Sequence, residues 1–100
     1  MNTDNKNILL KVKNGDFDSF RAFYDNHYKY VFRMGMIVTR NNQEQALKIT
    51  TDVFTSLWSQ KHTLDPNLSA EENIKAHALK IMSDALKNGI KQAKNELFKK

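Results

Sequence analysis

The feature that most constrains this chain is how few of its residues can break a helix. Its 100 residues include only three glycines and one proline, and no long alternation of β-branched residues occurs that would indicate strands. The sequence therefore predicts an all-α fold. We expect a single domain over residues 1–100, a compact bundle of about four helices joined by short connections.

Turn and capping residues divide the chain into four predicted helices, near residues 4–14, 16–40, 42–61 and 69–95. Asp4, Asp16 and the Asn41–Asn42 pair are the expected N-caps of the first three helices. Asn14 and Gly15 are typical of a helix C-terminus and end the first one.

A loop over residues 62–69 is predicted to precede the fourth helix, because Pro66 disfavours a helical conformation at Asp65. Ser69 and Glu72 then form a capping box. Apolar residues recur every three or four positions within each helix. They predict a core that includes Phe20, Tyr24, Val31, Ile49, Val53, Phe54, Leu57, Ile81 and Ala85. On the fourth helix the inner side is expected to carry Ile74, Ala78, Ile81, Met82, Ala85 and Leu86.

The composition excludes several classes of chemistry. There is no cysteine, so disulfides, thiolate catalysis and cysteine-ligated metal sites are ruled out. His27, His62 and His77 lie on separate predicted elements, and His27 and His77 are expected to be partly buried in packed faces. No phosphate-binding loop or nucleophile motif occurs. We therefore expect no enzyme activity, no catalytic residue, no metal site and no cofactor.

Targeting features are also missing from the sequence. No apolar run approaches the ~20 residues that span a bilayer, and the first residues lack the basic and apolar regions of a signal peptide. The sequence therefore predicts a cytoplasmic protein without a membrane partner.

Positive charge is concentrated on the predicted fourth helix of a chain with a net charge of +5. Four of its lysines fall within a sector of about 60°: Lys80, Lys87, Lys91 and Lys94. Such a row can follow a phosphate backbone and release counterions. Asn73 and Asp84 share the sector, and Asp84 partly neutralises it. An ordinary solvated face is the alternative explanation of the same spacing.

Several strings of the sequence resemble region 2 of bacterial RNA polymerase sigma factors, most closely the extracytoplasmic-function (ECF) group. They are LLKVKNGD at 9–16, FRAFY at 20–24, YVFR at 30–33, DVFTSLW at 52–58 and LDP at 64–66. The resemblance covers roughly residues 8–92. It implies that the third helix binds the clamp of core RNA polymerase, and that the fourth helix with the loop before it captures melted minus-ten promoter DNA.

The resemblance and the charge pattern together select two sets of candidate residues. The DNA-binding set is His62, Asn67, Lys80, Asp84, Lys87, Lys91 and Lys94. The partner-binding set, on the outer side of the third helix, is Lys48, Thr51, Asp52 and Thr55. An anti-sigma factor is a further candidate partner.

Two stretches depart from the family pattern. Residues 45–52 read QALKITTD, where the family usually has Asp-Ala-Glu-Asp-[Ile/Leu]-Val-Gln-Glu, so Lys48 replaces an acid. Ser83 and Asp84 stand where Arg-Asn is usual. Three hypotheses remain open: an ECF-like sigma domain, in a chain without the family's second helix-turn-helix domain (region 4); a degenerate sigma-like protein-interaction module that no longer engages core polymerase; or an unrelated basic four-helix protein.

Overall fold

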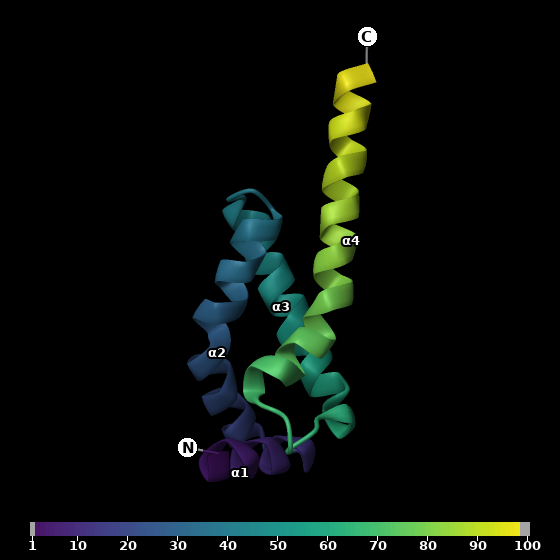
Figure 1. The fold of residues 1–100 in the computed structure, drawn as a ribbon. Coiled ribbons are helices and arrows are strands. Elements are labelled where there is room, and N and C mark those ends of the chain that lie inside the picture. The colour runs from purple at the N-terminus through teal and green to yellow at the C-terminus, as the bar shows by residue number, and fades with distance from the viewer. Residues whose placement is uncertain (1, 99–100) are drawn as a thin grey trace.

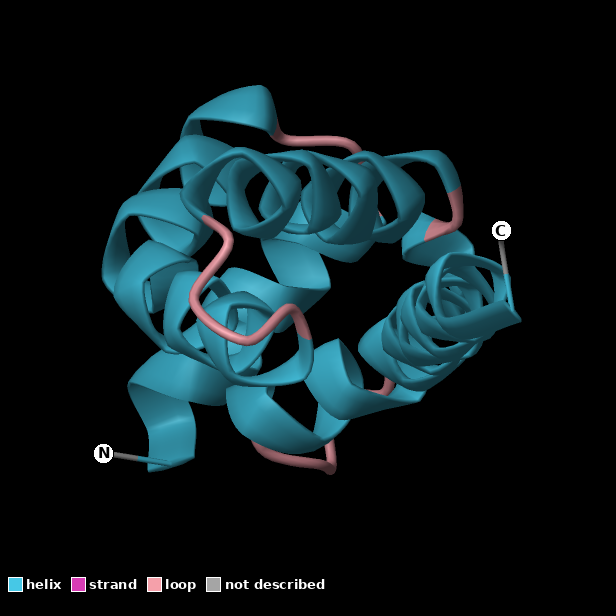
Figure 2. Ribbon diagram, turned by 90° about the horizontal axis from the view of Figure 1, so that it is seen from above, coloured by secondary structure: helices cyan, strands magenta, loops and turns pink. Residues whose placement is uncertain are grey.

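The computed structural model describes the backbone of residues 2–98 and the side chains of residues 6–91. It contains five helical elements: α1 (Asn2–Lys13), α2 (Phe17–Val38), α3 (Gln43–Ser59), the short 3-10 helix η1 (Lys61–Thr63) and α4 (Ala70–Phe98). Within this range there is no strand, as Figure 2 shows. The all-α fold with four main helices is confirmed.

The helices pack as an antiparallel pair with a third helix alongside and a short helix across one end. α2 and α3 run side by side in opposite directions, and α1 crosses their lower end (Figure 1). α4 packs against both over its first part and then extends past them, which gives the molecule dimensions of 57 × 21 × 20 Å. No helix in the described range is both long enough and apolar enough to cross a membrane.

Local chemistry sets the helix starts largely as predicted. The Asp16 carboxylate accepts a hydrogen bond from the Asp18 backbone N–H at 3.2 Å, and the Asn42 side-chain oxygen accepts one from the Gln45 N–H at 3.1 Å. Each side chain satisfies a backbone donor that the first turn leaves without an intrahelical partner. The predicted caps of α2 and α3 are therefore confirmed.

The capping box of α4 and the end of α1 are confirmed as well. The Glu72 N–H donates to the Ser69 hydroxyl at 3.0 Å, and the Ser69 N–H donates to the Glu72 carboxylate at 3.0 Å. α1 stops before Gly15, whose φ of 90° is a conformation that glycine adopts without strain. The Asp4 prediction is wrong, because α1 begins at Asn2 and includes Asp4.

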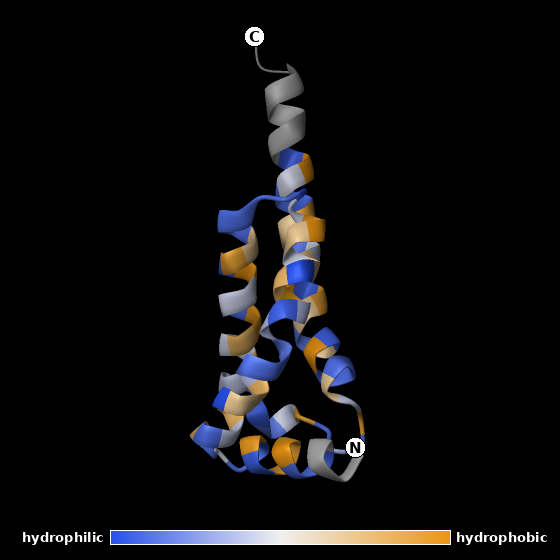
Figure 3. Cartoon of the chain, turned by 90° about the vertical axis from the view of Figure 1, so that its left-hand side faces the viewer, coloured by the Kyte–Doolittle hydropathy of each residue, from blue (hydrophilic) through white to orange (hydrophobic). Residues whose placement is uncertain are grey.

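The core lies between α2, α3 and the first half of α4, closed below by α1. It is built from the buried residues Leu9, Val12, Phe23, Val31, Ile49, Val53, Phe54, Leu57, Leu64, Ala70, Ile74, Ala78 and Met82. Hydrophobic residues accordingly gather on the inward sides of the helices in Figure 3. Four residues expected to be fully buried instead pack partly exposed against this core: Phe20, Tyr24, Ile81 and Ala85.

Phe54 is the centre of the core's aromatic contacts. Its ring lies 4.7 Å from that of Tyr24, 6.4 Å from that of Phe23 and 6.5 Å from that of Phe20, each in an edge-to-face arrangement. Such pairs add stabilisation beyond the buried area. The buried position predicted for Phe54 is confirmed.

Candidate functional site

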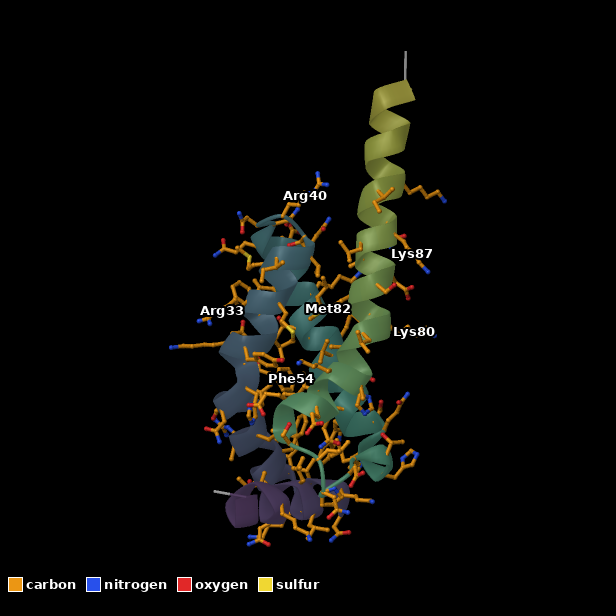
Figure 4. The ribbon with its side chains drawn as sticks, viewed as in Figure 1. Arg33, Arg40, Phe54, Lys80, Met82 and Lys87 are labelled. Atoms are coloured by element: carbon orange, nitrogen blue, oxygen red, sulfur yellow. The ribbon has the colours of Figure 1, made fainter. Side chains whose placement is uncertain are left out.

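Three of the four described lysines of α4 stand on one exposed side of the helix, and the fourth, Lys75, lies on another side. Lys80, Lys87 and Lys91 are all exposed, and Figure 4 shows Lys80 and Lys87 on the side of α4 that faces away from α2. Lys80 and Lys91 are about 16 Å apart along the helix axis. We call these three residues the lysine row. The fourth predicted member, Lys94, lies outside the described side chains.

Asp84 is exposed in the same row, one helical turn from Lys80 and from Lys87. A carboxylate at this position opposes the attraction that the lysines exert on a phosphate. Asn88, which directly follows Lys87, is exposed and neutral. The lysine row is therefore positive with one acidic interruption near its middle.

Asn73 belongs to the same predicted sector, yet it is buried rather than solvated. Its amide nitrogen donates to the Asp65 carbonyl at 3.0 Å and the Ser69 carbonyl at 2.9 Å, and its oxygen accepts from the Asp65 N–H at 2.8 Å. Asn73 thus fastens the loop to α4. On the side of α4 that carries the lysine row, residues are exposed only beyond Asn73.

The loop before α4 is anchored at several points. Leu64 is buried in the core, and the Asn67 N–H donates to the Asp65 carboxylate at 2.9 Å, which forms a tight local turn. His62 on η1 and Asn67 are both exposed, as a nucleic-acid contact requires. The loop therefore presents its two candidate residues on a fixed scaffold.

The charge around the loop is unfavourable for phosphate. A hollow of about 540 Å³ beside it is lined by Lys6, Glu71 and Glu72 together with the loop residues 66–69. The two carboxylates outnumber the one ammonium group. Along α4, Lys87 is about 27 Å from Ser69. The predicted DNA-binding residues therefore form two separate surfaces, of which only the lysine row is basic.

The four predicted partner-binding residues of α3 are all exposed, but they face two different grooves. Lys48 and Asp52 line a groove between α3 and α4. Thr51 and Thr55 line an aromatic groove between α2 and α3. The split follows from helix geometry, because at 100° per residue the four positions span about 100° of α3, with Lys48 and Asp52 toward one edge and Thr51 and Thr55 toward the other.

The α3–α4 groove brings together residues from both predicted sites. It has a volume of about 390 Å³ and is lined by Lys48 and Asp52 of α3 and by Asp84, Asn88 and Gly89 of α4, among others. Lys48 and Asp84, expected to contact a protein and DNA respectively, therefore share one cavity. A ligand of either kind in this groove would meet charges of both signs.

The aromatic groove is smaller and more apolar. About 270 Å³ in volume, it is walled by Phe17, Phe20, Tyr24, Phe54 and Trp58 beside the two threonines. Phe17 is 60% exposed and meets the Trp58 ring edge-on at 5.6 Å. The Lys61 ammonium lies 4.4 Å from the Trp58 ring centroid, within range of a cation–π contact. Trp58 and Phe54 thus pack this end of α3 against α2.

His77 joins α4 to α3 and η1. The Thr63 hydroxyl donates to the Gln60 carbonyl at 2.8 Å, so it is available to accept from the His77 Nε2–H, 3.2 Å away. The Ser56 hydroxyl lies 3.2 Å from Nδ1. Both contacts fit a neutral imidazole with its proton on Nε2, to whose Nδ1 the Ser56 hydroxyl donates. Burial lowers the pKa of His77, which also favours the neutral imidazole. The predicted partly buried position of His77 is confirmed.

A third groove lies between α2 and α4, and none of its residues was predicted from the sequence to bind a ligand. It is lined largely by apolar side chains, among them Met34 of α2 and Leu79 and Leu86 of α4. Leu86 was expected on the inner side of α4 but is 47% exposed. The apolar residues of α4 cover a wider sector of the helix than the part that contacts the core, and this feature of the sequence could have revealed the surface.

Comparison with protein-family models, with curated proteins and with solved structures finds no match to this chain. Function must therefore be inferred from the residues and the surfaces that they form. Among the described residues, no cluster of three or more His, Asp or Glu side chains could hold a metal ion.

Proposed function

We propose that this chain is a promoter-binding and polymerase-binding domain similar to region 2 of ECF sigma factors. The observation that carries the proposal is the lysine row, with Lys80, Lys87 and Lys91 exposed together on one side of the helix that the resemblance assigns to promoter DNA. The loop with His62 and Asn67 leads directly into this helix. Melted minus-ten DNA is the proposed ligand.

Phosphate attraction by the lysine row would provide most of the affinity for DNA. With about three contacts, the logarithm of the binding constant should fall with the logarithm of salt at a slope of roughly −2 for a single strand. Asp84 lowers the affinity by repelling phosphate, so Asp84→Asn should tighten binding.

The test is a salt titration of a fluorescent single-stranded oligonucleotide with the full chain. Replacing Lys87 and Lys91 by Ala should weaken binding and make the salt slope shallower by about 1.4. The matched control replaces Lys11 and Lys13 of α1, which are equally exposed, and removes the same charge. If both double variants bind equally well, attraction depends on net charge alone and the lysine row is only a solvated face.

Core polymerase is the proposed protein partner, through α3. Lys48 stands where the family carries an acid that meets basic residues of the clamp, so Lys48→Asp should strengthen binding to purified core polymerase by restoring attraction. Lys29→Asp on α2 changes the net charge equally at another exposed position and should have less effect. Weaker binding by a folded Lys48→Asp variant would contradict the proposed orientation of α3.

The second candidate is a sigma-like protein-interaction module that does not engage core polymerase. The exposed, basic Lys48 favours it, because it repels a basic clamp surface. Gel filtration of the chain with core polymerase separates the two candidates. Co-elution supports the sigma-like domain, whereas separate elution together with retained DNA binding would leave the interaction module.

A further inference from the structure

The α2–α4 groove is an apolar channel that the fold leaves open. It has a volume of about 280 Å³. Six apolar side chains line it, Met34, Val38, Ala78, Leu79, Met82 and Leu86, and only two polar residues join them, Lys75 and Ser83. Met82 is almost fully buried, whereas Leu79 is 70% exposed. The groove therefore has a recessed floor and an exposed apolar edge.

The exposed edge continues along α4 as a regular row. Leu79, Leu86 and Ile90 are 70%, 47% and 57% exposed, and at 100° per residue they fall within about 40° of one another. Exposed large apolar side chains aligned in this way mark interaction surfaces more often than isolated ones do. We call these three residues the apolar row.

A lysine directly follows every member of the apolar row. The pairs are Leu79–Lys80, Leu86–Lys87 and Ile90–Lys91. One residue is about 100° around a helix, so the lysine row runs parallel to the apolar row along the outer side of α4. A ligand that lay on the apolar row would meet ammonium groups along its flank.

The basic residues around the groove lie mostly on α4. Lys75 lines the groove itself, whereas the α2 wall is apolar, formed by Met34 and Val38. In Figure 4, Met82 lies between α2 and α4, and Lys80 and Lys87 project from the far side of α4. Positive charge therefore lies in the groove at Lys75 and beside its α4 edge.

We propose that the α2–α4 groove binds an acidic amphipathic helix of a partner protein. The apolar ridge of such a helix would fill the space above Met82 and cover Leu79 and Leu86, in the helix-in-groove mode. Its flanking Asp and Glu side chains would face Lys75 in the groove and Lys87 beside its α4 edge. Charge complementarity of this kind speeds association and fixes the register.

Two other occupants fit these observations less well. A second copy of this chain also carries a net charge of +5, so its basic residues would repel those beside the groove. A bilayer surface is flat on this scale and cannot reach the recessed Met82, whereas side chains projecting from a helix can. The groove shape and the charge of its borders together favour the acidic helix.

This proposal does not depend on the domain's binding to DNA or to polymerase. It nevertheless has a consequence for DNA binding, because Lys80 and Lys87 belong to both surfaces. An acidic helix in the groove would compete with nucleic acid for these lysines. Binding of the helix and of DNA are measured separately, so failure of one leaves the other intact.

The probe is a fluorescein-labelled peptide of about 20 residues, long enough to form a helix, with Leu at the a and d positions of each heptad and Glu at the exposed positions. Its control has Lys in place of every Glu. Fluorescence anisotropy with the full chain should show binding of the Glu peptide that is at least about tenfold tighter than that of the Lys peptide. Equal binding of both peptides would overturn the proposal.

Matched variants locate the site. Leu86→Ser should weaken binding of the Glu peptide about tenfold. Leu47→Ser on α3 is the control, because Leu47 is also 47% exposed and does not line the groove, and it should change binding less than about twofold. Circular dichroism of both variants checks that the helix content is unchanged. Equal effects of the two variants would place the peptide elsewhere and overturn the proposal.

Two further measurements test the other occupants. Sedimentation equilibrium should show a monomer, and vesicles of mixed phosphatidylcholine and phosphatidylserine should bind wild type and Leu86→Ser equally. A dimer that Leu86→Ser dissociates would assign the groove to a second copy. Vesicle binding that Leu86→Ser abolishes would assign it to a membrane surface. Either result, obtained without peptide binding, would overturn the proposal.

Discussion

Gly35 and Gly89 each lie within a long helix, but their surroundings differ completely. A Cβ atom added at Gly35 would lie 3.2 Å from the Ala46 carbonyl oxygen and 3.3 Å from the Ala46 Cα, whereas one added at Gly89 would meet nothing within 4 Å. The α2–α3 pair is therefore packed backbone against backbone. The outer part of α4 has no such neighbour on that side.

This contrast separates two tasks within one small chain. The α2–α3 pair, with α1 and the first half of α4, holds nearly all the buried residues and fixes the fold. The described part of the second half of α4, residues 85–91, adds little to the core but carries exposed lysines and exposed apolar residues side by side. Because this part of α4 is not needed to build the core, its side chains are available to contact a partner.

The largest expected effect is in the packed region, at Phe54. Phe54→Ala removes a buried ring that touches three other aromatic rings, and the cavity should lower the free energy of unfolding by about 3–5 kcal/mol. Urea denaturation followed by circular dichroism measures this change. Phe17→Ala removes a ring of the same size that is 60% exposed and should cost much less. Equal losses in the two variants would contradict the placement of the core.

A smaller loss is expected at the α2–α3 contact. Gly35→Ala gains helix propensity but forces its methyl group against the backbone of Ala46, which cannot rotate away as a flexible side chain could. The helices must separate slightly, and we expect a net loss of about 1–3 kcal/mol. The same denaturation experiment measures it. A stabilised Gly35→Ala variant would show that the α2–α3 contact is looser than the structure indicates.

The junction of α3, η1 and α4 should make stability depend on pH. Burial lowers the pKa of His77 below its ordinary value of 6.5, so below about this pH the unfolded chain binds more protons than the folded one. The free energy of unfolding should therefore decrease as the pH falls through this value, and the decrease should level off below the folded-state pKa.

Comparison of variants isolates the contribution of His77. Burial also lowers the pKa of His27, so the wild-type slope contains both residues. His77→Gln should give a shallower slope than wild type between pH values of about 7.5 and 5.5. An unchanged slope in this variant would remove His77 from the pH dependence.

Much of the fold could be predicted because its signals are local. A cap such as Asp16 or Asn42 bonds to a backbone group only two or three residues away, so the sequence contains both partners. Helical spacing likewise identifies Val31 and Val53 as buried. The predicted start at Asp4 is wrong, because α1 begins two residues earlier, at Asn2.

The surfaces were harder to predict because they depend on how far neighbouring helices reach. Leu86 has the spacing of a core residue, yet it is about half exposed where α4 leaves the bundle. Asn73 has the spacing of a surface residue, yet the loop that folds back over it buries its amide. Periodicity assigns a residue to a side of its helix, but tertiary contacts decide whether that side is covered. The assignment of DNA and polymerase as ligands stays a prediction.

The smallest expected effect, at Gly89, is the sharpest test of the contrast between the two regions. Gly89→Ala adds a methyl group that meets no atom within 4 Å, so the helix-propensity gain of up to about 1 kcal/mol is not offset by a clash. If the outer part of α4 unfolds together with the bundle, the gain raises the free energy of unfolding. If that part unfolds separately, the gain raises the helix signal at 222 nm without shifting the main transition. A loss of stability would show that Gly89 packs against a neighbour, and the outer part of α4 would then belong to the core rather than to a contact surface.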